Sequence, residues 1–465
     1  MKTQGEQLHR GLEERHINFM ALGATIGVGL FLGSATAIQM AGPAILILYT
    51  LGGIAVFLIM RALGEMAVHN PVAGAFSRYA QDYLGPLPGY LTGWTYWFMW
   101  IVVCMAEITA VGVYMHVWFP DVPNWIWAFC ALVIMGTANF AAVKLYGEFE
   151  FWFALVKIVT IVLMIIGGGL MITMGIGNGG APTGISNLWT HGGFMPNGVV
   201  GMLGALPMVI FAYQGVEMLG LTAGEARNPE RSLARAVNSV FWRVVIFYVG
   251  ALFVVMSIYP WNQIGTQGSP FVLTFGRLGI SAAAGLINFV VLTAALSSCN
   301  SGIFSTGRML YNLALQGQAP RQFARVSNGG VPVYGVLFSV VLLLIGVVLN
   351  YLAPGQVFTW LTAVSTFAGV WTWGVILVAH LRFRRRVSVV ELSRLPILLP
   401  LFPLTSYVAL AFLAFVMVIM VQSPGTRVAL VIGPMWIALL IALYFFFGVK
   451  DKAPDRDIAV KSHAT

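Results

Sequence analysis

Long apolar runs alternate with short polar segments along almost all of this 465-residue chain. The runs are about twenty residues long, the length that a helix needs to cross the ~30 Å hydrocarbon core of a bilayer. Charged residues, glycine and proline separate the runs, so each run predicts its own membrane-spanning helix. About twelve spans are predicted in this way, near residues 17–38, 43–67, 88–118, 123–143, 150–173, 198–222, 236–259, 271–306, 331–351, 355–382, 398–421 and 427–448. The chain is therefore predicted to be an all-α polytopic membrane protein.

The placement of lysine and arginine between the spans predicts an orientation. One set of alternate segments holds nearly all of them, from Lys2 at the start through Arg384–Arg386 to Lys461 near the end. The other set, near 119–124, 174–197, 260–270 and 351–355, contains none. Because cytoplasmic loops carry the excess of basic residues, both termini are expected to be cytoplasmic, in the cell inner (plasma) membrane.

Composition agrees with this pattern. Hydrophobic residues make up 59% of the chain and charged residues only 9%, with a mean hydropathy of +0.86. A soluble domain carries roughly 25% charged residues, so soluble and fibrous classes are excluded. The net charge of +9 follows from the basic loops, and nucleic acid is not expected as a partner. The three cysteines lie in separate apolar runs without metal-like spacing, so no metal site is expected.

The first predicted span contains Gly23, Gly27 and Gly29 within seven residues. Each glycine weakens a helix by ~1 kcal/mol relative to alanine. Unwound backbone inside a bilayer is tolerated only where it lines a cavity, and it exposes the N-terminus of the next half-helix, whose N–H groups suit a carboxylate. The alternative interpretation is a face of small residues for close helix packing.

The sixth predicted span is interrupted in the same way. Gly215 lies inside the apolar run Phe211–Gly220, and Glu217 follows it. Interrupted helices at corresponding positions in two halves of a chain are typical of inverted-repeat transporters, whose substrate binds at the repeat interface. Spans one and six are five apart, as two five-helix repeats require. The sequence therefore predicts a 5+5 inverted repeat with a substrate site at broken helices 1 and 6.

This organisation predicts one membrane domain and no separate soluble domain. The predicted units are a cytoplasmic tail (1–16), the permease domain (17–448) with repeats near 17–173 and 198–382 and further helices near 398–448, and a second cytoplasmic tail (449–465).

Several stretches resemble the bacterial amino acid transporter branch of the amino-acid–polyamine–organocation superfamily. They are RGLEERHINFMALGATIGVGLFLGS, GPAILILYTLGG, MRALGEM, GYLTGWTYW, GEFEFWFALVKI, FAYQGVEMLGLTAGEARNP, INFVVLTAALSSCNSG and STGRMLY. The resemblance implies a LeuT-like fold and amino acid transport, with permeases for proline, for histidine, and for threonine and serine among the similar proteins. Val28 departs from the pattern, since many relatives have a small hydroxyl residue there, so carboxylate recognition at this turn is expected to depend on backbone N–H groups.

Three ionisable residues fall inside predicted spans, where each costs roughly 2.5–3.5 kcal/mol on insertion scales: Glu107, Lys157 and Glu217. A lysine removed from water can exchange protons. By resemblance, Lys157 is the candidate proton-coupling site; a permanently paired structural lysine is the alternative. Glu217 either serves the substrate site or holds the broken segment together. Glu107 faces substrate, protons or only a polar helix contact.

Further site residues follow from the same two spans. A bound amino acid is expected to place its carboxylate at the N–H groups of Gly27, Val28 and Gly29, and its ammonium at carbonyl groups near Thr25, Phe211 and Gln214. The substrate-binding residues are predicted to be Thr25, Gly27, Val28, Gly29, Glu107, Phe211, Gln214, Gly215 and Glu217. By resemblance, Phe211 is an aromatic gate, and Ser297 and Ser298 are a remnant of an ion site. Trp94, Trp97 and Trp100 are interpreted as interface and packing residues.

The predicted function is a proton-coupled permease that imports a zwitterionic amino acid by alternating access. By resemblance, histidine or proline is favoured as substrate. An exchanger of the same fold and a non-transporting amino acid sensor are the alternatives. An enzyme is not expected, because no nucleophile–base pair or metal-ligand cluster is evident. The expected partners are the amino acid, the proton and the lipid bilayer, with the proton gradient in place of any cofactor.

Overall fold

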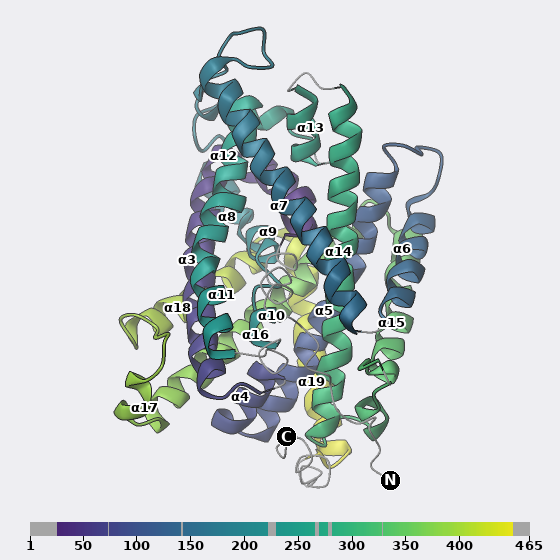
Figure 1. The fold of residues 1–465 in the computed structure, drawn as a ribbon, viewed down its shortest axis with the longest axis vertical. Coiled ribbons are helices and arrows are strands. Elements are labelled where there is room, and N and C mark those ends of the chain that lie inside the picture. The colour runs from purple at the N-terminus through teal and green to yellow at the C-terminus, as the bar shows by residue number, and fades with distance from the viewer. Residues whose placement is uncertain are drawn as a thin grey trace.

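The computed structural model describes residues 26–72, 74–140, 143–221, 229–265, 269–277, 281–327 and 329–449. Within these ranges the chain folds into helices and contains no strand. Long helices lie side by side in one bundle (Figure 1). Thr25 and both predicted tails lie outside the described residues, apart from Val449.

The long helices follow the apolar runs of the sequence. They are α3 (Ile45–His69), α5 (Pro86–Met115), α7 (Val143–Met174), α14 (Ser281–Leu315), α15 (Val333–Leu352), α16 (Val357–Arg386), α18 (Leu404–Gln422) and α19 (Arg427–Phe446). α6 (Asn124–Ala138) is shorter. The shorter α11 (Pro229–Arg243), η5 (Val244–Gly250) and α12 (Ala251–Ile258) form one continuous rod.

In the described part of the chain, nine apolar segments are long enough to cross a membrane. One of them, Gly29–His69, holds two predicted spans, because the chain turns at Gly42, whose φ is +59°. Two shorter apolar helices, Asn124–Ala138 and Gly198–Ala212, match two more predicted spans. The protein is thus an all-helical, multi-pass membrane protein, while twelve crossings and the inverted repeat stay predictions.

The predicted span 271–306 differs from the observed helices. It is divided between α13 (Pro270–Arg277) and α14, which begins at Ser281 and continues to Leu315. The sequence also left unassigned α4 (Ala75–Leu84), a short amphipathic helix after α3.

Burial identifies the centre of the bundle. In the most apolar stretch of α5, 83% of the residues are buried, and in that of α16, 78% are buried. In that of α19, only 22% are buried. α5 packs against α14 and α16. Side chains on every face of α5 are therefore buried against neighbouring helices. A helix that is apolar all round is expected in such a buried position.

The two ends of the bundle differ in charge. α13 and the loop after α7 lie at one end, and α4 and the short α17 (Val389–Ser393) lie at the other (Figure 1). The arginines Arg78, Arg384–Arg386 and Arg394 belong to the α4 end. The predicted sorting of basic residues therefore recurs in space.

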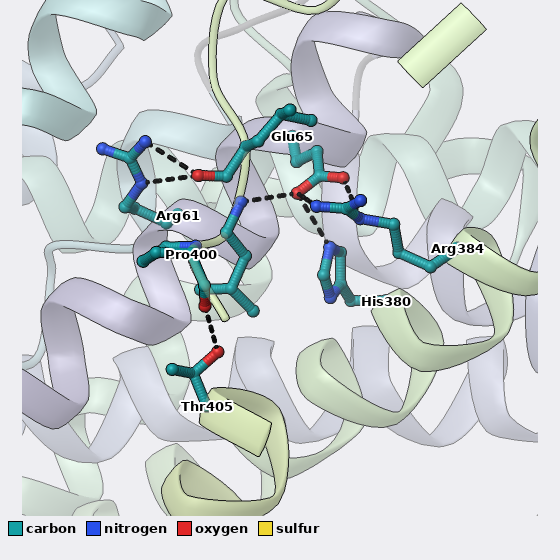
Figure 2. A network of polar contacts seen from close by, with 8 residues as sticks. Arg61, Glu65, His380, Arg384, Pro400 and Thr405 are labelled. Atoms are coloured by element: carbon teal, nitrogen blue, oxygen red, sulfur yellow. Dashed lines mark hydrogen bonds and ion pairs between the residues drawn. The ribbon is translucent and has the colours of Figure 1, made fainter. Parts of the chain in front are cut away.

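A buried carboxylate anchors the α4 end (Figure 2). Glu65 on α3 is completely buried. It accepts hydrogen bonds from Arg384 on α16 (3.1 Å) and from the backbone N–H of Leu399 (2.9 Å), and its Oε2 lies 3.1 Å from Nε2 of His380. Arg61, one turn earlier, donates to the backbone of the same segment before α18. One carboxylate thus joins α3, α16 and the start of α18.

Candidate functional site

The described part of the first broken helix starts at the predicted break. Ile26 and Gly27 form a bend, and helical structure begins at Val28 and continues through the π-helix η1 (Gly29–Gly33) into α2 (Ser34–Ala41). The N–H groups of Leu30 and Phe31 both donate to the Gly27 carbonyl, at 3.2 and 3.3 Å. The helix therefore has a true N-terminus at mid-bundle, with first-turn N–H groups directed away from the helix body.

The second predicted helix is also broken. α8 (Gly198–Gly204) and α9 (Leu206–Ala212) end at a turn over 213–217, and α10 (Met218–Leu221) follows. Gly215 has a φ of +100°, which only glycine adopts easily. Both oxygens of Glu217 accept the Gly215 N–H at 3.1 Å, and the indole N–H of Trp373 donates to Oε2 at 3.3 Å. Glu217 thus stabilises the turn by accepting its backbone N–H and links it to α16 through Trp373.

The two breaks touch each other. A Cβ atom on Gly29 would lie 2.5 Å from the Cα of Ala212, so only glycine allows this approach of two backbones. Gln214 is held on α16, because its Nε2 donates to the Ser365 carbonyl at 2.8 Å and its Oε1 accepts from the Ser365 hydroxyl. The broken helices and α16 therefore form one packed unit.

A small cavity lies where the breaks meet α5 and α14. Its lining residues are Gly27, Gly29, Trp100, Val103, Glu107, Phe211, Ala212, Gln214 and Ser298. Its volume is about 10 Å³, which is room for about one water molecule. Six of the site residues predicted from the sequence line it, whereas Val28, Gly215 and Glu217 do not.

Glu107 enters the cavity from α5. Its Oε2 accepts a hydrogen bond of 3.4 Å from the Val28 N–H, and the Ser298 side chain is a second hydrogen-bonding neighbour. Its Oε1 lies 2.6 Å from the position of a Cβ on Gly27. A carboxylate thus occupies the N-terminus of the first helix's second half, a position that favours negative charge.

Lys157 approaches the same break from α7. It is completely buried, and its Nζ donates to the Ile26 carbonyl at 3.3 Å and to Oγ of Ser297 at 3.0 Å. Ser297 in turn donates to Oε1 of Glu150 at 2.8 Å. The structure therefore brings Lys157 and Ser297 together, next to the cavity but outside its lining.

Glu150 was missed from the sequence because it lies at the first residue of the predicted span 150–173, where a charge is ordinary. The signal was its spacing from Lys157. Seven residues are about two turns of an α-helix, so both side chains share one face of α7.

The tryptophans of α5 differ from one another. The indole N–H of Trp97 donates to Ser339 on α15 at 3.0 Å, and that of Trp94 donates to the Gln318 carbonyl, in the turn after α14, at 3.2 Å. Both are thus packing residues of α5. Trp100 is 1% exposed and packs against the ring of Tyr96, and it also lines the cavity.

Comparisons with known proteins agree with this architecture. The family model for amino acid permeases matches residues 16–456. The chain is 63% identical to the amino acid permease YtnA of Bacillus subtilis over 463 residues, covering 99% of this chain and 100% of YtnA. It is 50% identical to the probable threonine/serine transporter YbxG of Bacillus subtilis, over 96% of both chains, and 45% identical to the aromatic amino acid transport protein AroP of Shigella flexneri, over 99% of both.

These matches confirm the resemblance seen in the sequence, and they cover both broken helices, α5, α7 and α14. Members of the family move amino acids across membranes and are not enzymes. With its multi-pass helical architecture and a family match from residue 16 to residue 456, this chain belongs to the amino acid permease family.

Proposed function

We propose that this protein is a proton-coupled permease that imports a zwitterionic amino acid by alternating access, across the inner (plasma) membrane and with cytoplasmic termini. One observation carries the proposal: Gly27 and Gly29, at the N-terminus of a half-helix, line a cavity that the second helix break also lines. An α-amino acid has an anionic and a cationic end close together, and paired half-helix ends suit both.

The carboxylate of the substrate is proposed to bind the N–H groups of Gly27, Val28 and Gly29. Its ammonium is proposed to bind backbone carbonyls near Thr25, Phe211 and Gln214, with the Glu107 carboxyl group beside it in the cavity lining. Since Glu107 holds the Val28 N–H in the closed cavity, the arriving carboxylate replaces it there.

Proton coupling is proposed to depend on Lys157. Its ammonium bonds the Ile26 carbonyl directly at the first break, so loss of its positive charge weakens a hydrogen bond that holds the unwound backbone. A change in charge at Lys157 is thereby linked to the shape of the substrate site. The alternation between access states follows the rocking of two repeats expected of this architecture.

The substrate proposed first is histidine or proline, on the sequence resemblance. The name of YbxG keeps threonine and serine as rivals, and that of AroP adds the aromatic amino acids. Competition of radiolabelled uptake by all twenty amino acids in proteoliposomes ranks them directly.

The same vesicles test the coupling. With an inward proton gradient, substrate should accumulate above its external concentration, and a protonophore should abolish the accumulation. Undiminished accumulation after the protonophore would contradict proton coupling and favour exchange. Binding without any flux would favour a sensor.

A further inference from the structure

A ladder of buried polar groups leads away from the substrate cavity between α7 and α14. Lys157, Ser297 and Glu150 are each completely buried. Nζ of Lys157 lies 3.0 Å from Oγ of Ser297, which lies 2.8 Å from Oε1 of Glu150. Ser301 and Asn300, one turn further along α14, are also hydrogen-bonding neighbours of the Glu150 carboxyl group.

The direction of these hydrogen bonds follows from the chemistry of the groups. An ammonium only donates, and an ionised carboxylate only accepts. The Ser297 hydroxyl therefore accepts from Lys157 and donates to Glu150, which orients the whole chain from the lysine towards the glutamate. Such an arrangement is ready for proton transfer without any side-chain rotation.

Resting on the proton coupling proposed above, we infer that Glu150 is the proton acceptor for Lys157, with Ser297 as the relay. In the transfer, an N–H bond of the Lys157 ammonium breaks as a new O–H bond forms on Ser297. The original O–H bond of Ser297 breaks as an O–H bond forms on Glu150. The products are a neutral lysine, an unchanged serine hydroxyl and a neutral carboxylic acid, so charge and atoms balance.

The ladder also has a direction along the membrane. Glu150 lies nearer than Lys157 to the start of α7 at Val143. Beyond it, Asn300 accepts a hydrogen bond of 2.7 Å from Asn139, at the C-terminal end of α6. The end of α6 and the start of α7, where Lys144 lies, are on the side predicted to be cytoplasmic. Glu150 would thus pass the proton towards the cytoplasm, as an importer driven by protons requires.

Charged groups flank Lys157 on two sides. Glu150 and Glu107 both interact electrostatically with Lys157. From α14, the uncharged Ser297, Asn300 and Ser301 face this pair. Lys157 therefore lies between Glu107 at the substrate cavity and Glu150 on the side predicted to be cytoplasmic.

The test uses purified protein in proteoliposomes with a pH-sensitive dye inside, together with radiolabelled substrate. The variants are Glu150→Gln and Ser297→Ala, and Ser297→Thr restores the hydroxyl group. Glu148→Gln is the matched control, since it removes a carboxylate two residues away on α7, on a different face of the helix. Counterflow at equal pH on both sides measures substrate movement without net proton movement.

In Glu150→Gln and Ser297→Ala, substrate-driven acidification of the lumen should fall by about 100-fold, the lower end of what a positioned proton-transfer group supplies. Counterflow should persist, and Ser297→Thr and Glu148→Gln should retain both activities. Normal acidification in Glu150→Gln would overturn the relay while leaving proton coupling intact. Loss of counterflow in both relay variants would assign them a structural role and also overturn it. If the wild-type protein itself moves substrate without acidification, the proposed coupling fails first.

Discussion

The backbone N–H of Val28 donates a hydrogen bond of 3.4 Å to Oε2 of Glu107, across 79 residues of sequence. This side-chain carboxylate therefore takes the position proposed for the carboxylate of the substrate. Two ionised carboxylates at one helix N-terminus repel each other. The substrate should accordingly bind best when Glu107 is protonated, which links substrate binding to pH at the cavity itself.

Glu107→Gln should make substrate affinity less dependent on pH. In the wild-type protein, the apparent Kd should rise as the pH rises, because an ionised Glu107 competes for the Val28 N–H. A hydrogen bond to a charged group contributes about 1.5–3 kcal/mol, so the rise should be about tenfold or more. Binding titrations at several pH values measure it. An equally steep pH dependence in the variant would contradict the competition.

Gly29→Ala should abolish uptake while leaving membrane insertion unchanged. The new Cβ would lie 2.5 Å from the Cα of Ala212, so the two broken helices must separate. Since a 1 Å misplacement can cost about 100-fold at a binding site, initial uptake should fall on that scale, and Gly29→Leu should do the same. Gly169→Ala on α7 is the control, because its Cβ meets nothing within 4 Å. Normal transport by Gly29→Ala would refute the site.

Lys157→Gln should uncouple transport from the proton gradient. The amide keeps a donor for the Ile26 carbonyl but carries no titratable proton. Accumulation against a concentration gradient should disappear, and the remaining uptake should no longer respond to the proton gradient. Uptake and counterflow measured in the same vesicles separate loss of coupling from loss of binding. Persistent uphill, pH-dependent uptake in this variant would show that the lysine is structural.

Glu65→Ala should destabilise the fold by about 3 kcal/mol or more, because it leaves Arg384 and the Leu399 N–H without their buried acceptor. Thermal unfolding in detergent measures the loss. Asp82→Asn is the control: it removes an ion pair with Arg78 whose side chains are 42% and 30% exposed, and such pairs contribute at most about 1 kcal/mol. Equal shifts in both variants would contradict the importance of burial.

The sequence predicted the two helix breaks because their cause is local. Gly27, Gly29 and Gly215 mark positions where a helix weakens, and the cost of free backbone groups in lipid implies a cavity beside them. Glu107 and Lys157 were also detectable, since an ionisable residue in the middle of an apolar run has few structural explanations.

Other parts of the site depend on long-range packing. The N–H of Val28, which is predicted to bind the substrate carboxylate, donates to Glu107 from 79 residues away, and no local pattern specifies this partner. Trp100 differs from Trp94 and Trp97 only in the segments that pack against α5 at its position, and these come from distant parts of the sequence. Glu150 gains its importance from Ser297 on another helix, which the sequence of α7 does not contain.

The narrow cavity between the breaks bears on how affinities of this protein should be interpreted. If the cavity is wide enough for an amino acid in only about 1% of molecules, the apparent Kd is about 100-fold weaker than the intrinsic one. A substitution that only favours the open population would then strengthen binding without contacting the substrate. Differences in apparent affinity among variants thus report the opening equilibrium as well as the contacts, and the two separate only when kinetics of opening and binding are measured together.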